Sequence, residues 1–271
     1  MHIIAEITHK CPANCPFCPI KKSVVNKMYM DISEFKSALK LFTTLPHSRR
    51  LLTISGGEPT LIKSLHRFVK VAHEYGFTVT VATNCYNPEC LLKAKPDFVQ
   101  ISIDSINSNH NMSRRLKLWH KVLEVLKYVK EGKLSGFIRY TLMKDNISEL
   151  YQLKSRLIAL GLNMKIYAMP IRGCPELAPS REDVLKILKN GVAVLPSRCP
   201  AGKGQFVLTP DMKVLDCIFH RQVLGVLERF DEDELVAIVE NGRKLKPYPC
   251  GSPYWWVECP SVQSECHQRE G

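Results

Sequence analysis

The sequence lacks the features that mark membrane-spanning and secreted proteins. No hydrophobic run approaches the roughly 18 residues that a membrane-spanning helix requires, and no internal repeat or low-complexity stretch is present. The chain leads directly into a strand-like segment, so we expect no signal peptide and a cytoplasmic protein. Its 271 residues are 45% hydrophobic and 24% charged. This composition is typical of a globular protein with one large domain, or one domain and a small appendage.

Acidic residues are scarce relative to basic ones. The chain contains 38 Lys and Arg against 26 Asp and Glu, which gives a net charge of +12. This excess favours an anionic partner, such as nucleic acid, an acidic protein or a phosphorylated substrate. The basic residues are spread along the chain, however, and a solvated lysine-rich surface explains them equally well. Charge alone therefore identifies no substrate.

Cysteine, in contrast, is abundant. Eleven cysteines without a secretory signal favour metal or redox chemistry over disulfides. Six of them precede a proline, which fixes φ and removes an amide donor, and so suits a rigid cage of thiolates. These six are Cys11, Cys15, Cys18, Cys174, Cys199 and Cys259. We interpret Cys85, Cys90 and Cys174 as structural thiols, with a catalytic thiol as the alternative for Cys174.

The first 170 residues alternate between short apolar segments, often β-branched, and amphipathic segments. The apolar segments predict strands at His2–Thr8, Arg50–Ser55, Thr78–Thr83, Phe98–Ile103, Gly136–Leu142 and Lys165–Met169. The amphipathic segments predict helices at Ser33–Leu45, Leu61–Tyr75, Pro88–Ala94, Ser113–Glu131 and Ile147–Leu160. Six successive βα units predict an α/β fold with a parallel sheet and right-handed crossovers. Six units are fewer than a closed barrel needs.

The pattern changes after Pro170. A loop over Ile171–Pro179 leads to a predicted helix near Arg181–Lys189, and a hairpin is predicted from Gln205–Leu208 and Lys213–Cys217. A charged helix at Asp231–Lys244 follows. We therefore place a domain boundary near residue 195, which gives domains 1–195 and 196–271.

Three cysteines near the N-terminus, Cys11, Cys15 and Cys18, form a CxxxCxxC motif. A structural zinc site needs four protein ligands, and an ordinary [4Fe–4S] electron carrier needs four cysteines. Three thiolates on a [4Fe–4S] cluster leave one iron open for a substrate. A zinc loop whose fourth ligand lies elsewhere is the alternative. The spacing resembles the signature of radical S-adenosylmethionine (radical SAM) enzymes, in which the amino and carboxylate groups of SAM chelate the open iron.

The resemblance implies a partial (β/α)6 barrel with a SAM site at the carboxyl ends of its strands. Gly56-Gly57-Glu58-Pro59 follows the second predicted strand and resembles the GGE motif that holds the SAM amino group. Two glycines let the backbone come close to a ligand. An ordinary turn between a strand and a helix is the alternative for this motif taken by itself.

Five further positions match the family's SAM contacts, and an ordinary polar residue at a strand end is the alternative for Ser102, Asp104 and Arg139. The resemblance places Phe17 beside the adenine, Ser102 and Asp104 at the ribose, and Arg139 at the SAM carboxylate, and Asn84 lies in a matching turn. A bidentate guanidinium fits a carboxylate well. The turn reads Thr83-Asn84-Cys85 where the family has Thr-Asn-Gly, so cysteine replaces a glycine there.

The C-terminal third resembles the SPASM and twitch extensions of radical SAM enzymes. In those extensions, a cysteine, a hairpin and a second cysteine are followed along the chain by a strand, a helix and further cysteines. The matching cysteines are Cys199, Cys217, Cys250, Cys259 and Cys266. The resemblance implies one auxiliary [4Fe–4S] cluster held by Cys199, Cys217 and two of the last three, with a zinc site as the alternative. Met212 stands where the family has a hairpin glycine, so we expect that turn to be made differently.

The implied activity is reductive cleavage of SAM to a 5′-deoxyadenosyl radical, which abstracts a hydrogen from the substrate. An auxiliary cluster favours net oxidation or crosslinking of a peptide or protein side chain. Dehydrogenation of a small polar metabolite and RNA modification are the alternatives. Against a peptide substrate, we expect no N-terminal peptide-recognition domain. A low-potential donor of the ferredoxin or flavodoxin type is the expected electron source. An iron–sulfur or zinc-stabilised binding or electron-transfer protein is the alternative of a different class.

Overall fold

The structure is a computed structural model that describes residues 1–22, 26–172, 174–194 and 201–245. These residues divide into two compact units. The first contains Met1–Cys11, Pro19–Val99 and Pro200–Lys246, and the second contains Pro12–Cys18 and Gln100–Cys199, so far as they are described. No helix in the described ranges has the length and hydrophobicity to cross a membrane.

The first unit is built on a mixed sheet. Its strands are β1 (His2–Thr8), β2 (Leu51–Gly56), β3 (Thr78–Thr83), β7 (Gln205–Leu208), β8 (Lys213–Leu215) and β9 (Val223–Val226). They lie in the order β3-β2-β1-β7-β8-β9. Strands β3, β2, β1 and β7 are parallel, whereas β8 and β9 are antiparallel to their neighbours. The buried strand β1 therefore lies between the N-terminal strands and the C-terminal hairpin.

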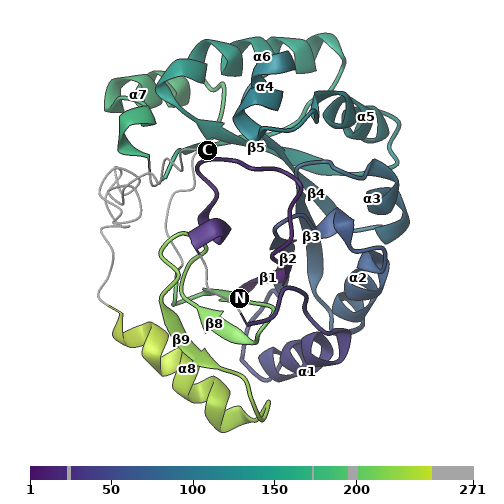
Figure 1. Ribbon diagram of the computed structural model, residues 1–271, viewed down its shortest axis with the longest axis vertical. Coiled ribbons are helices and arrows are strands. Elements are labelled where there is room, and N and C mark those ends of the chain that lie inside the picture. The colour runs from purple at the N-terminus through teal and green to yellow at the C-terminus, as the bar shows by residue number, and fades with distance from the viewer. Residues whose placement is uncertain (23–25, 173, 195–200, 246–271) are drawn as a thin grey trace. The chain divides into compact units, whose positions relative to one another are not determined.

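Amphipathic helices cover this sheet (Figure 1). They are α1 (Ile32–Phe42), α2 (Leu65–Glu74), α3 (Pro88–Ala94) and α8 (Glu232–Lys244), with short 3₁₀ helices at Pro19–Lys22 and Pro59–Leu61. Helix α1 begins where the Asp31 side chain accepts a hydrogen bond from the backbone nitrogen of Ser33. Its buried face includes Phe35, whose ring contacts that of Phe68 in α2 edge to face at 5.1 Å. Helical spacing of apolar residues thus places both helices on one core.

The described part of the second unit contains parallel strands and four α-helices. The strands are the end of β4 (Phe98–Ile103), β5 (Gly136–Leu142) and β6 (Ile166–Pro170), and the helices are α4 (Asn107–Arg114), α5 (Trp119–Lys130), α6 (Ile147–Ala159) and α7 (Arg181–Lys189). Short 3₁₀ helices lie at Lys144–Asn146 and Pro175–Leu177. On β5, Ile138, Tyr140 and Leu142 are fully buried. The alternate residues of β5, including Arg139, therefore point to the opposite face.

The six strands predicted in the first 170 residues agree with the structure to within one residue at either end. The predicted hairpin is present as β7 and β8, and its second strand ends at Leu215, two residues before the predicted end. The single helix predicted over Ser113–Glu131 is wrong, because the chain forms α4 and α5 there. Arg115 takes a left-handed conformation with φ 51°, which ends α4. The side chain of Asn111 then accepts hydrogen bonds from the backbone nitrogens of Leu118 and Trp119, and so starts α5.

The boundary predicted near residue 195 lies outside the described residues and stays a prediction. The parallel pairing of β7 with β1 was not predicted from the sequence. It follows from contacts between segments that lie about 200 residues apart, to which local periodicity gives no access.

Candidate functional site

The GGEP turn packs directly on the backbone that leads into the first cysteine loop. The backbone nitrogen of Gly57 donates to the carbonyl oxygen of Thr8 at 2.6 Å, and that of Glu58 donates to the carbonyl oxygen of Lys10 at 2.9 Å. A Cβ atom on Gly56 would lie 2.1 Å from the Thr8 oxygen, and one on Gly57 would lie 2.1 Å from the Lys10 oxygen. Gly56 also has φ +127°, which other residues rarely adopt. The chain's own backbone therefore requires both glycines.

Glu58 joins this turn to the end of β3. Its buried Oε1 accepts hydrogen bonds from the backbone nitrogen and hydroxyl of Thr60 and from the hydroxyl of Thr83, at 3.0, 2.6 and 2.6 Å. Its Oε2 accepts from the backbone nitrogen of Asn84 at 2.8 Å. Burial raises the pKa of Glu58 above its ordinary value, although these hydrogen bonds act in the opposite direction. The carboxylate is thus held by the protein's own donors, and Thr60 was not identified from the sequence.

Asn84 reaches the first cysteine. Its side-chain nitrogen donates to the sulfur of Cys11, with 3.7 Å between the two atoms. Hydrogen bonds to the sulfurs are one of the factors that set the reduction potential of an iron–sulfur cluster. The next residue, Cys85, is buried and has φ 67°. It therefore adopts the left-handed conformation that glycine favours, and its backbone nitrogen donates to the Thr83 hydroxyl at 2.8 Å.

The three N-terminal cysteines are reduced, and they fall on both sides of the division between the units. Cys11 belongs to the first unit, and Cys15 and Cys18 belong to the second. None of the three forms a disulfide. Within the described part of the chain, no three Cys, His, Asp or Glu side chains come together closely enough to hold a metal ion. The donor set, three thiols with an amide donor on one of them, fits a [4Fe–4S] cluster with an open iron, and its geometry stays a prediction.

Asp104 is paired within the second unit. Oδ1 of its buried carboxylate accepts a hydrogen bond from Nη2 of Arg114 at 2.9 Å, and Oδ2 lies 2.6 Å from Nε of Arg114 in an ion pair. The carbonyl oxygen of Arg114 in turn accepts from the backbone nitrogen of Asn14, between the first two cysteines. Nearby His110 is buried, and burial and the charge of Arg114 lower its pKa to about 4. It is therefore neutral, and its Nδ1 accepts from the backbone nitrogen of Asp104 at 3.3 Å.

This pairing bears on the predicted ribose contact. Ser102 is half-buried on β4, but both oxygens of Asp104 already bind Arg114. Asp104 is therefore an anchor for the cysteine loop in this structure, and its contact with a ribose stays a prediction. Arg114 was not identified from the sequence.

Arg139 has the properties of an anion-binding residue. Burial of its guanidinium and the positive charge of Arg172 lower the pKa of Arg139 to about 10. Arg139 is half-buried by exposed area, and none of the ion pairs among the described residues includes it. Burying a charge is costly unless the charge is paired, so this position favours binding of an external carboxylate. Phe17, predicted at the adenine, is half-buried.

Cys217 lies in a tightly organised loop after β8. Its sulfur accepts a hydrogen bond from the backbone nitrogen of Phe219 at 3.4 Å, and its carbonyl oxygen accepts from that of Arg221 at 3.0 Å. The carboxylate of fully buried Asp216 accepts from the backbone nitrogen of Gln222 at 2.9 Å. Cys217 thus has the amide donor that suits a thiolate ligand. The other cysteines predicted for the auxiliary cluster, Cys199, Cys250, Cys259 and Cys266, lie outside the described residues.

The hairpin before Cys217 corrects one expectation. Met212 was expected to require a different turn from that of the family's glycine. It adopts the left-handed conformation itself, with φ 59°. Its backbone nitrogen donates to the Thr209 carbonyl at 3.1 Å, and its side chain is buried. Packing of the side chain offsets the strain of this conformation, which is on the order of 1–2 kcal/mol.

Two of the three remaining described cysteines, Cys85 and Cys90, have the environment expected of structural thiols. Cys85 is fully buried, and burial raises the pKa of the Cys90 thiol, which disfavours its reactive thiolate form. Cys174 is buried as well, but it is disulfide-bonded. The prediction of a free thiol at this position, structural or catalytic, is therefore wrong.

One family model, described as the Radical SAM superfamily, matches residues 5–157 of this chain, which is more than half of its length. The chain belongs to the radical SAM superfamily. This membership confirms the predicted class of enzyme and its cofactors, SAM and a [4Fe–4S] cluster. The roles of individual residues at the SAM site stay predictions.

Two curated relatives share the same name. The PqqA peptide cyclase of Bradyrhizobium diazoefficiens is 24% identical over 261 residues, a match that covers 83% of this chain and 68% of the relative. The PqqA peptide cyclase of Granulibacter bethesdensis is 24% identical over 202 residues, which covers 68% of this chain and 52% of the relative. This radical SAM chain therefore spans between about half and two thirds of the length of these relatives.

Solved radical SAM structures share the fold. Native anSMEcpe with bound AdoMet and the Kp18Cys peptide has a TM-score of 0.71 and 14% identity, covering 98% of this chain and 91% of that one. Streptococcus suis SuiB bound to the precursor peptide SuiA has a TM-score of 0.69 and 13% identity, covering 98% and 75%. These neighbours confirm the predicted α/β partial barrel.

Proposed function

We propose that this radical SAM enzyme oxidises or crosslinks a side chain of a peptide substrate after abstraction of a hydrogen atom. Both curated relatives are named peptide cyclases, and two of the solved neighbours hold a peptide. The chain spans only part of the length of those relatives, so we infer the substrate class from this similarity.

One feature of the geometry supports the SAM-dependent part of the proposal. The GGEP turn, the turn after β3 and the entry to the first cysteine loop form a continuous hydrogen-bonded unit. It runs from Thr8 and Lys10 through Gly57 and Glu58 to Asn84, which returns to the Cys11 sulfur. The carboxyl ends of parallel strands are the usual place for such sites in barrels. This unit has the glycines, amide donors and thiolate that a SAM-binding cluster site needs.

When bound, SAM and the [4Fe–4S] cluster supply a 5′-deoxyadenosyl radical by reductive cleavage of the sulfur–C5′ bond. We assign Cys11, Cys15 and Cys18 to hold the cluster. The close-packed Gly56–Gly57 backbone faces the SAM amino group in this proposal. The buried guanidinium of Arg139 binds the SAM carboxylate with charge-assisted hydrogen bonds.

The residues at the adenosine end of SAM are assigned by resemblance to the family. Phe17 is proposed beside the adenine and Ser102 at the ribose. Asp104 is proposed there too, where a ribose hydroxyl would share its carboxylate with Arg114. The Asp104–Arg114 pair also fixes the backbone at Asn14, because the Arg114 carbonyl binds it. Asp104 thereby positions the cysteine loop whether or not it contacts SAM.

Net oxidation releases an electron, and the C-terminal cysteines are proposed to hold its acceptor. Cys199, Cys217 and two of Cys250, Cys259 and Cys266 would bind an auxiliary [4Fe–4S] cluster. The amide donor on the Cys217 sulfur supports a thiolate ligand at that position. A zinc site on the same thiolates is the alternative. A ferredoxin or flavodoxin type of protein is proposed as the electron donor for SAM cleavage.

Iron content and SAM cleavage test the cofactor assignment. Anaerobically reconstituted protein should hold about eight irons as two [4Fe–4S] clusters, and the variant with Cys11, Cys15 and Cys18 all replaced by Ala should hold about four. With dithionite and SAM, the wild type should form 5′-deoxyadenosine, and Cys15→Ala should form none. About one zinc and four irons per chain would reject the auxiliary cluster while leaving the SAM-binding cluster in place.

A Cys217→Ala variant tests whether SAM cleavage and oxidation of the substrate depend on different clusters. If it folds, it should still form 5′-deoxyadenosine but give little oxidised product, because the proposed electron acceptor has lost a ligand. Full product yield without a second cluster would show that the C-terminal cysteines serve structure or substrate binding only.

The substrate class is tested with peptides encoded beside the gene. Each is incubated with SAM and dithionite, and the loss of two hydrogens is measured by mass spectrometry. Transfer of deuterium from a labelled peptide into 5′-deoxyadenosine identifies the site of abstraction. Turnover with RNA or a small polar metabolite, and none with peptides, would overturn the peptide assignment.

A further inference from the structure

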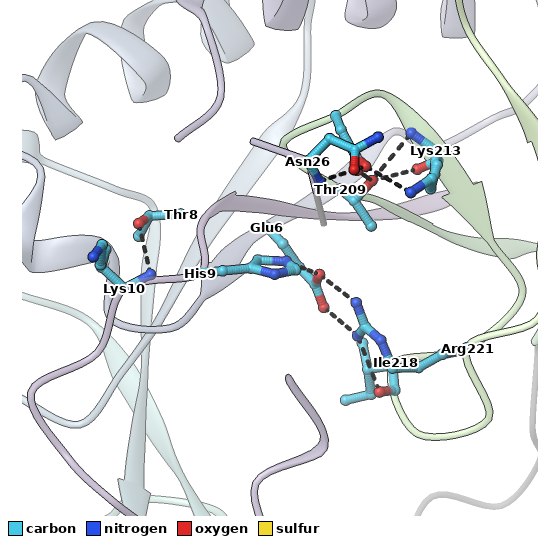
Figure 2. Close-up of polar contacts among 10 residues, drawn as sticks. Glu6, Thr8, His9, Lys10, Asn26, Thr209, Lys213, Ile218 and Arg221 are labelled. Atoms are coloured by element: carbon cyan, nitrogen blue, oxygen red, sulfur yellow. Dashed lines mark hydrogen bonds and ion pairs between the residues drawn. The ribbon is translucent and has the colours of Figure 1, made fainter. Parts of the chain in front are cut away.

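A buried ion pair joins the Cys217 loop to β1. Glu6 lies in the interior of β1 and is 1% exposed. Both of its carboxylate oxygens accept from the Arg221 guanidinium, Oε1 from Nη1 at 2.7 Å and Oε2 from Nη2 at 2.8 Å. Nε2 of His9 lies 2.7 Å from Oε2. Figure 2 shows the His9 ring and the Arg221 guanidinium converging on this one carboxylate.

The charge state of Glu6 follows from these contacts. Burial acts to raise the pKa of Glu6, but the hydrogen bonds from Arg221 and His9 hold it below its ordinary value. Glu6 is therefore an anion in the folded protein, and the bidentate pair fixes the direction from which Arg221 approaches. A planar guanidinium gives this specificity, which a lysine cannot reproduce.

Arg221 also closes the turn that holds Cys217. Its backbone nitrogen donates to the Cys217 carbonyl at 3.0 Å, and its Nη1 donates to the Ile218 carbonyl at 3.3 Å. Ile218 packs against a buried cluster that includes Ile4 of β1. The loop is thus attached to β1 at two places, one ionic and one apolar, and Arg221 belongs to both the attachment and the turn.

From Glu6, strand β1 continues toward the GGEP turn and the first cysteine loop. Two residues after Glu6, the carbonyl oxygen of Thr8 binds the nitrogen of Gly57, and Cys11 follows three residues later. Residues 215 positions apart in the sequence therefore connect the loop of Cys217 with the strand that leads to Cys11. Both attachments lie within the first compact unit.

Stability alone does not account for such a pair. Replacing a buried ion pair by apolar residues of similar volume is often neutral or stabilising, whereas removing one partner is costly because it leaves an uncompensated buried charge. A pair of this kind can serve to specify one arrangement among several. Here the arrangement that it specifies is the position of the Cys217 loop along β1.

We propose that Glu6 and Arg221 are positioning residues for Cys217, which hold its sulfur at one place relative to β1. The link to electron transfer rests on the proposed function, in which Cys217 is a ligand of the auxiliary cluster. The positioning itself concerns only the protein, and it can be measured without a cluster.

The test uses the full chain in reduced, metal-free form and again after reconstitution. The rate at which iodoacetamide alkylates Cys217 is measured by peptide mass spectrometry, and the free energy of unfolding is measured in urea. Arg221→Met and Glu6→Gln should each raise the alkylation rate by at least about tenfold, because each leaves the loop without its ionic attachment. Arg229→Met is the matched control, since Arg229 pairs with Asp231 at an exposed site, and its rate should equal that of the wild type.

The double variant Glu6→Gln/Arg221→Met separates positioning from stability. It leaves no uncompensated charge, so its free energy of unfolding should return toward that of the wild type, while alkylation of Cys217 stays fast. Arg221→Lys, which keeps the charge without the bidentate geometry, should be intermediate and is the variant of choice if Arg221→Met does not fold. Recovery of the wild-type alkylation rate in the double variant, or unchanged rates in both single variants, would overturn the proposal.

Reconstituted samples give a second readout. In the background without Cys11, Cys15 and Cys18, the double variant should shift the midpoint potential of the remaining cluster, whereas Arg229→Met should not. If no second cluster forms in any sample, the auxiliary-cluster assignment fails, and the alkylation rates still decide the positioning role of Glu6 and Arg221.

Discussion

Replacing Gly57 with alanine tests whether the close contact between the GGEP turn and the backbone leading into the first cysteine loop excludes any side chain at this position. The added Cβ would lie 2.1 Å from the carbonyl oxygen of Lys10, 2.5 Å from its carbonyl carbon and 2.9 Å from that of His9. All three are backbone atoms of a segment that continues from β1, so no flexible side chain can move aside. The turn itself must shift away from this backbone.

The shift breaks two hydrogen bonds, from Gly57 to Thr8 at 2.6 Å and from Glu58 to Lys10 at 2.9 Å. Each buried donor left unsatisfied costs about 1–3 kcal/mol. We therefore expect Gly57→Ala to lower the free energy of unfolding by about 2–5 kcal/mol, in the range typical of strong single-residue effects. The same shift moves Glu58 and Asn84 relative to Cys11, so formation of 5′-deoxyadenosine should also fall.

The assay is urea unfolding of the reduced protein, followed by circular dichroism, with Gly204→Ala as the matched control. Gly204 has no atom within 4 Å of its ideal Cβ position and no left-handed φ, so its replacement should change the free energy of unfolding by less than about 0.5 kcal/mol. Equal stability of the two variants, with SAM cleavage intact in both, would refute the close-packing account of the turn.

Three further predictions concern buried charges. Arg114→Met should lower the free energy of unfolding by about 3–5 kcal/mol, because it leaves the buried Asp104 carboxylate without its partner. The control Lys127→Met removes an exposed ion pair and should change the free energy of unfolding by less than about 1 kcal/mol. Urea unfolding of the two variants measures the difference. Arg139→Ala should weaken SAM binding by about 1.5–3 kcal/mol in calorimetry, and unchanged affinity would place the SAM carboxylate elsewhere. Because the folded-state pKa of Glu6 is below its ordinary 4.5, its contribution to stability is present above that value and is lost as pH falls through the folded pKa. Unfolding in acid should show a smaller pH slope for Glu6→Gln, and an unchanged slope would contradict the assignment.

Local signals in the sequence were sufficient to predict most of the strands and helices. A strand such as Thr78–Thr83 is recognisable from its β-branched residues, and a helix such as Ile32–Phe42 from the spacing of Phe35, Leu39 and Phe42. The exception, Ser113–Glu131, shows the limit of periodicity. Its apolar spacing continues across the break, while the side chain of Asn111 and the left-handed Arg115 end one helix and start the next.

Two positions at which the family has glycine show a different limit of prediction from sequence. The sequence has cysteine at position 85 and methionine at 212, and from identity alone both turns looked altered. Both residues nevertheless adopt left-handed φ, at 67° and 59°. Both side chains are buried, and burial in the surrounding core stabilises a conformation that the residue type alone disfavours.

The sequence by itself determined the family, because the CxxxCxxC spacing and the GGEP turn are local arrangements, and it predicted the role of the first cysteine loop. Only the tertiary structure decided which groups neutralise the buried charges. Glu6 appeared in the sequence as one charge in an apolar strand, and its partner Arg221 lies 215 residues away. Likewise, β7 pairs with β1 and not with a neighbour in sequence. The physical reason is that periodicity and spacing report the conformation of a segment, whereas the partner of a buried charge or of a strand edge depends on contacts made when distant segments pack together.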